Sequence, residues 1–366
     1  MDRKKLLKVL GLAALFIVLL LALLIIFTII RSSSIDKQIA AYEAKRKIPD
    51  FENAAVLYEK LFTDVNFIGI IEDRIYKQMT MGEDYYKPWK SKDCPEEAEF
   101  LEKSKNVFPI FIEIARREKC FFSMLNNDQK DMTILKDARS WAQFLRLSAN
   151  NDIGDQRFND AIEKSRIIQK IGDHFQQQSI LTYFLVGIAV EAISLRCTKS
   201  IILDPNATEN QLQLIEKLPV KIEDKWNTIM PQLLAGENYY ARKIVMKYPF
   251  LTRYTMMLRS KSMAKSTLES ISKLYLRFLA DKRGNRILIE LRRYKNQNGQ
   301  WPEKLEQIKS FVDPNVLIDP QNNGSFVFKK ADNDFILYSR GPNNIDEGGN
   351  SNSPADDWPI WIPPKK

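Results

Sequence analysis

The strongest constraint on this chain is an uncharged apolar run near its N-terminus. From Val9 to Ile30, 22 consecutive residues carry no charge and are nearly all Leu, Ile, Ala, Val or Phe, with Lys8 and Arg31 at the two ends. As an α-helix the run is about 33 Å long, enough to cross a hydrocarbon core of about 30 Å. The apolar core of a secretory signal peptide is shorter, at about 7–15 residues. We therefore expect one transmembrane helix over residues 9–30.

The charges around this run predict its orientation. Residues 1–8 hold four Lys or Arg, and a short basic tail favours the cytoplasmic side. We expect a single-pass protein of the inner (cytoplasmic) membrane, with residues 1–8 in the cytoplasm and the body in the periplasm or outside. Two alternatives stay open. Ser32 and Ser34 have the spacing of a signal-peptidase site, and Gly11 fits prepilin processing, although Phe16 then stands where prepilins carry Glu.

Composition excludes several kinds of chemistry. The chain has one histidine, His174, and lacks GxSxG, GxxxxGK[ST] and GxGxxG motifs, so no metal site with two histidines and no standard nucleotide loop is available. We expect His174 at the surface or at a helix end rather than in catalysis. Three cysteines (Cys94, Cys120 and Cys197) lack CxxC spacing, and their pairing stays open. The sequence predicts a protein that is not an enzyme.

Net charge gives little evidence for a nucleic-acid partner. The chain has a net charge of +9, of which residues 1–31 contribute +4. The remaining residues contribute +5 and contain no basic run longer than Lys45–Lys47. We expect a mildly basic, solvated surface and no nucleic-acid binding.

The body divides by composition into three parts. Residues 34–260 show apolar residues at helical spacing, and Gly154-Asp155 between two such stripes resembles a tetratricopeptide helical hairpin. The apolar run Ile180–Val190 is too short to span a membrane, so we expect a buried core helix. Residues 261–294 predict a long connecting helix, with Gly284 as a candidate break or kink.

Residues 295–366 differ from the rest. They hold 8 of the 16 prolines and 5 of the 13 glycines, which ends the long helices. The runs 326–328 and 335–338 predict a hairpin, and 358–362 a third strand or a packed tail. The expected fold class is mainly α, with a small C-terminal α+β domain that contains a short antiparallel sheet.

An acidic loop near the C-terminus is the candidate site. Residues 341–364 contain no Lys or Arg but four acids, together with three glycines and several Asn and Ser. The acids are Asp346, Glu347, Asp356 and Asp357. Such oxygen-rich loops suit Ca²⁺, which takes six to eight oxygen ligands. By composition alone, a solvated loop is the simpler interpretation.

A resemblance favours the calcium interpretation. The region from Ile287 to Trp361 resembles the C-terminal part of the major pseudopilin of type II secretion. The shared features are a helix ending at Tyr294, Asn298-Gly299-Gln300-Trp301-Pro302, Asp319-Pro320 before a hairpin, and the run from Phe335 to Asn344. The resemblance implies a pseudopilin-like domain with a calcium loop.

Within that loop, the resemblance implies four ligands: the Arg340 carbonyl, Asn343, Asp356 and Asp357. Asp346 is an extra candidate without a family counterpart. Asn343 stands where the family has Asp, so we expect weaker calcium binding than in the family. The whole layout also resembles uncharacterised bacterial membrane-anchored proteins.

These observations predict a membrane-anchored envelope protein of binding or scaffold type, related to secretion or pili, with an unidentified envelope protein as partner. Two alternatives remain. One is an envelope hydrolase that uses Asp346 and Asp356 as acid and base. The other is a divergent pseudopilin that joins a filament.

Overall fold

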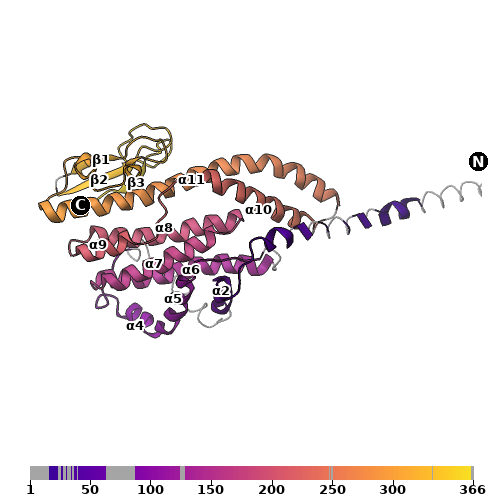
Figure 1. The fold of residues 1–366 in the computed structure, drawn as a ribbon, viewed down its shortest axis with the longest axis horizontal. Coiled ribbons are helices and arrows are strands. Elements are labelled where there is room, and N and C mark those ends of the chain that lie inside the picture. The colour runs from indigo at the N-terminus through magenta and orange to yellow at the C-terminus, as the bar shows by residue number, and fades with distance from the viewer. Residues whose placement is uncertain are drawn as a thin grey trace, which may run out of the picture.

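The computed structural model describes residues 16–23, 26–27, 30, 34, 37–38, 40–62, 87–123, 128–246, 248, 250–331 and 333–363. The described part is mainly helical, with one small sheet near the C-terminus (Figure 1). The helices are α2 (Ala55–Phe62), α4 (Pro95–Lys103), η2 (Lys105–Val107), α5 (Phe108–Arg116), α6 (Asp128–Gly154), α7 (Phe158–Gln176), α8 (Leu181–Leu203), α9 (Glu209–Glu216), α10 (Trp226–Met246), α11 (Phe250–Asn298), η3 (Leu305–Ile308) and η4 (Pro314–Leu317).

Helix α8 is the centre of the body. It is apolar on every side, and α6, α7 and α11 pack around it (Figure 1). Its side chains enter all three apolar clusters of the described residues: Val190 belongs to the first, Ile201 to the second and Phe184 to the third. A helix that is hydrophobic all round must be covered all round. The order of the neighbouring helices follows from this requirement.

The expectation of a core helix at Ile180–Val190 is confirmed. Among the described helices, α8 has the length and hydropathy of a membrane span, but 67% of its most apolar window is buried inside the molecule. The helix ends at Leu203, where the Asp204 side chain accepts a hydrogen bond from the Asn206 N–H at 2.9 Å. This turn separates α8 from α9.

Helix α11 carries the C-terminal region along the body. It begins directly after Pro249 and continues to Asn298, so it extends beyond residues 261–294 at both ends. The helix continues through Gly284 without a break. A Cβ atom at Gly284 would lie 2.4 Å from a methyl carbon of Ile360. Gly284 therefore gives strand β3 room to pack on the helix.

The C-terminal sheet has three antiparallel strands in the order β1-β2-β3. They are β1 (Val327–Ala331), β2 (Asp334–Ser339) and β3 (Trp358–Trp361). The predicted hairpin is confirmed, with Ala331 paired to Asp334 at its turn, and the final apolar run is a strand. Phe335, Leu337 and Ile360 share one apolar cluster with α11 and with the ends of α6 and α8. The sheet and the helical body thus share a core.

The predicted transmembrane helix lies partly outside the described residues. Where it is described, at residues 16–23, 26–27 and 30, the backbone is helical. The large apolar side chains there are exposed by about half or more, from 49% at Leu20 to 66% at Phe16. The predicted cytoplasmic tail, residues 1–8, lies outside the described residues.

The chain just after this segment is fixed to the body. The Tyr42 ring packs on Tyr239 of α10 with ring centroids 5.0 Å apart. The Arg46 guanidinium donates to the Gln177 carbonyl at 2.6 Å, and the Ser123 hydroxyl donates to the Glu43 carboxylate at 2.7 Å. These contacts hold residues 42–46 against the body.

Candidate functional site

The acidic loop begins with a tight turn after β2. Gly341 has φ +62°, a conformation that favours glycine. A Cβ atom there would lie 2.3 Å from a carboxylate oxygen of Asp356. The Gly341 carbonyl also accepts a hydrogen bond from the Asn322 amide at 2.9 Å. Gly341 thus allows the two ends of the loop to meet.

Asp356 and Asp357 each present a buried carboxylate oxygen. Asp357 is fully buried, and its Oδ2 accepts hydrogen bonds from the N–H groups of Glu347 (3.0 Å) and Gly349 (2.7 Å). The other oxygen, Oδ1, is buried with no hydrogen-bond partner among the described residues, and the same holds for Oδ1 of Asp356. A buried oxygen without a partner is costly. These two oxygens belong to adjacent residues at the C-terminal end of the loop.

Glu347 connects the candidate ligands. Its carboxylate accepts from the Asn343 amide at 2.8 Å and from the Asp356 N–H at 3.5 Å. Burial, together with the neighbouring Glu347 carboxylate, raises the pKa of Asp357. The loop therefore brings the carboxylates of Glu347 and Asp357 close together. The sequence showed Glu347 as a loop acid but gave no reason to prefer it as a ligand.

Asp346 faces a different environment. Its carboxylate accepts from the hydroxyl of Tyr338, pairs with the Lys329 ammonium at 3.1 Å, and accepts from the Gly348 N–H at 3.0 Å. The hydroxyl of Tyr338, with these other donors, lowers the pKa of Asp346 to about 2. Asp346 is thus tied to the sheet, whereas Asn343, Asp356 and Asp357 are linked through Glu347.

Arg340 is held by the turn before the hairpin. Its N–H donates to the buried carboxylate of Asp319, which also accepts from the Gln321 N–H at 3.0 Å and the Asn322 amide at 2.8 Å. Asp319 therefore fixes the main chain from which the Arg340 carbonyl projects. The Asp319-Pro320 pair thus has a structural role beside the loop.

These residues meet part of the requirement of a calcium site. Ca²⁺ takes six to eight oxygens, including main-chain carbonyls. The loop offers two unpartnered carboxylate oxygens, the Glu347 carboxylate and the carbonyls of its turns. Within the described residues, no three His, Cys, Asp or Glu side chains are grouped so that they could hold one ion. The loop therefore supplies some of the oxygens that such a site needs, from two adjacent carboxylates.

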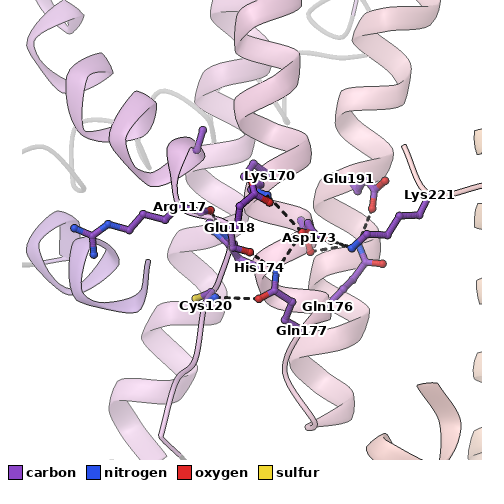
Figure 2. Close-up of polar contacts among 12 residues, drawn as sticks. Arg117, Glu118, Cys120, Lys170, Asp173, His174, Gln176, Gln177, Glu191 and Lys221 are labelled. Carbon is purple, nitrogen blue, oxygen red and sulfur yellow. Dashed lines mark hydrogen bonds and ion pairs between the residues drawn. The ribbon is translucent and has the colours of Figure 1, made fainter. Parts of the chain in front are cut away.

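His174 lies in the body, far along the chain from the loop, and is fully buried, although it is in the last turn of α7 (Figure 2). The expectation of a surface residue was therefore wrong, while the helix-end position was right. Its Nε2 is 2.7 Å from the Arg117 carbonyl, and its Nδ1 is 3.1 Å from the Tyr58 hydroxyl. Both ring nitrogens thus have protein partners, which leaves neither for a metal or a substrate.

Side chains close to His174 hold an extended segment, residues 117–123, beside α7 (Figure 2). Gln177 accepts from the Cys120 N–H at 2.9 Å and donates to the Glu118 carbonyl at 3.0 Å. Gln178 donates to the Cys120 carbonyl at 2.8 Å, and Asn53 bonds both main-chain groups of Phe121. These side chains replace the partners that a sheet would give the segment. They are structural.

The three cysteines are free. Cys120 and Cys197 are buried, and burial raises the pKa of both thiols, that of Cys197 to about 11. Cys94 is half-buried and its pKa is also raised, by burial and by nearby acids. A thiol with a raised pKa is a poor nucleophile at neutral pH.

A cavity of about 560 Å³ lies among α4, α5, α6 and α7. Leu101, Phe108 and Ile167 line its apolar part. Its polar part is a network in which Arg157 bonds Asp152 at 2.9 Å. Most of the side chains that line the cavity are polar or charged.

Comparison with known proteins gave no relative: the chain matches no protein-family model, no curated protein and no solved structure.

The His174 environment predicts a pH dependence of stability. Burial lowers the pKa of His174 from 6.5 to about 4, so the unfolded chain binds a proton at a higher pH than the folded chain. Neutral His174 therefore contributes about 3 kcal/mol to the free energy of unfolding above pH 6.5. This contribution is lost as the pH falls from 6.5 to 4. Chemical denaturation of the wild type and of His174→Gln should show this loss in the wild type alone. Parallel profiles would contradict the assignment.

Proposed function

We propose that the chain is a single-pass membrane-anchored protein whose body binds a partner and performs no catalysis. The observation that carries the proposal is the described helix at residues 16–23, whose large apolar side chains cover nothing in the body. Leaving such a helix in water is unfavourable by about 25 cal/mol per Å² of apolar area. A bilayer is the solvent that suits it, with the N-terminus inside and the body in the periplasm or outside.

Binding by the body is supported by the cavity among α4, α5, α6 and α7. Its lining combines apolar side chains with several charged ones, and His174, Cys120 and Cys197 are each held in structural roles. We propose an envelope protein as the partner.

The membrane anchor is tested by alkaline carbonate extraction of cell membranes. The wild-type chain should stay in the pellet. Leu19→Arg with Leu20→Arg should move it to the supernatant, because each Arg at a helix centre costs about 2.5–3.5 kcal/mol for insertion. Leu19→Ile with Leu20→Ile is the matched control and should stay in the pellet. Release of the wild-type chain by carbonate would refute the anchor.

We further propose that the acidic loop binds Ca²⁺ through Asp356 and Asp357, with Asn343 and the Arg340 carbonyl as additional oxygens. The two unpartnered buried oxygens and the raised pKa of Asp357 support this assignment. A divalent cation would supply both oxygens with a partner and stabilise the ionised carboxylates. The same loop supports a pseudopilin-like origin of the C-terminal region and a role related to secretion or pili.

Calcium binding is tested by thermal unfolding of the purified full chain in detergent, with Ca²⁺ or with a chelator. At 100 times the dissociation constant, binding adds about 2.7 kcal/mol, or about 3–5 °C for a chain of this size. Asp356→Asn with Asp357→Asn should abolish the shift. Asp346→Asn is the control, because it removes a carboxylate of the same loop that lies outside the proposed ligand set, and it should keep the shift. Equal melting with and without millimolar Ca²⁺ would exclude the site.

The hydrolase alternative has less support. The pKa of Asp346 is lowered to about 2, which keeps this carboxylate ionised and unsuited to a general acid at neutral pH. Its partners Tyr338 and Lys329 also occupy the oxygens that a substrate would need.

A further inference from the structure

The positive charge of the body is concentrated in one hairpin. We define the hairpin tip as residues 238–268, the end of α10 and the beginning of α11. It contains seven Lys or Arg and no Asp or Glu. Subtracting this +7 and the +4 of residues 1–31 from the whole chain's +9 leaves −2 for the rest. The +5 of the body is therefore unevenly distributed along the sequence, because the residues away from the tip carry a small negative net charge.

The hairpin tip lies at the membrane end of the molecule. Figure 1 shows the end of α10 and the beginning of α11 at the end of the body from which the N-terminal helix extends. The contact between Tyr42 and Tyr239 joins the two at a ring-centroid distance of 5.0 Å. The C-terminal sheet lies toward the opposite end of Figure 1.

The tip lies beyond the contact between Tyr42 and Tyr239. The proposed anchor ends at Ile30, twelve residues before Tyr42 in the sequence. From Tyr239 to Met246, α10 rises about 10 Å further toward the tip. The tip and the proposed anchor therefore lie at the same end of the body (Figure 1).

The composition of the tip suits a lipid surface. Apolar residues with large or flexible side chains alternate with the basic ones, and Tyr248 at the turn is 41% exposed. The basic residues are Arg242, Lys243, Lys247, Arg253, Arg259, Lys261 and Lys265. Basic residues attract anionic headgroups, and aromatic and apolar residues enter the interface. A nucleic-acid groove would need the charge but not the apolar residues.

We propose that the hairpin tip is a second membrane contact, which binds an anionic phospholipid leaflet beside the transmembrane helix. The proposal rests on the proposed anchor. With two attachments, the helical body keeps a fixed tilt on the membrane, and its cavity and acidic loop face away from the bilayer in a set orientation.

The test is hydrogen exchange of the full chain in lipid nanodiscs, with phosphatidylcholine alone or mixed with phosphatidylglycerol. Each Lys or Arg near an anionic leaflet strengthens association by about fivefold. We expect amides in residues 242–265 to exchange at least about tenfold more slowly in the anionic discs, and high salt to reverse the effect. Lys247→Glu with Arg253→Glu should abolish it.

The matched control is Lys304→Glu with Lys309→Glu, which makes the same change in charge at exposed residues of the C-terminal region. This variant should keep the protection of the tip. Equal exchange in the two kinds of disc, with the chain incorporated in both, would overturn the tip contact and leave the anchor intact. A chain that fails to enter the discs would overturn both. Equal protection by heparin in detergent would assign the tip to a soluble polyanion and overturn the lipid proposal.

Discussion

The fold depends on the need to cover α8. This helix supplies residues to every apolar cluster of the described structure, so α6, α7 and α11 are each required to remove part of its surface from water. Burying one large aliphatic or aromatic side chain gains about 1.5–3 kcal/mol. Helix α11 is one of the helices that cover α8, and it also packs against the C-terminal sheet. The helical body is therefore connected to the acidic loop through α11.

Polar side chains fix the geometry within this apolar framework. Glu191 of α8 and Lys282 of α11 form a buried ion pair at 2.8 Å, and Gln176 of α7 donates to the same carboxylate at 2.6 Å (Figure 2 shows Gln176 and Glu191). A buried pair of this kind adds specificity more than stability, because desolvation offsets most of the attraction. It determines how α11 lies against α8. In the same way, His174 and Tyr58 fix how α2 lies on α7.

The sequence predicted features that follow from local patterns. The apolar run at Ile180–Val190, too short for a bilayer, is the core helix, and the alternation around residues 326–338 is the hairpin. Local sequence patterns could not show contacts between segments that are distant in the chain. Asp346 and Asp356 are the same type of residue in the same acidic loop. The structure nevertheless distinguishes them, because Lys329 of β1 forms its ion pair with Asp346. The burial of His174 depends on Arg117, 57 residues away. A search for continuous basic runs also missed the positive charge of the hairpin tip, because its basic residues are spaced along two helices.

Topology labelling in intact cells tests whether the N-terminal helix tethers the body on the outer side of the membrane. In a Cys94→Ser background, in which the remaining cysteines are buried, a membrane-impermeant maleimide reports which side of the membrane a new cysteine occupies. The Phe51→Cys variant, at a position that is 76% exposed in the body, should be labelled from outside. The Lys4→Cys variant should be labelled only after the membrane is permeabilised. Labelling of the Lys4→Cys variant from outside, with the Phe51→Cys variant protected, would contradict the account.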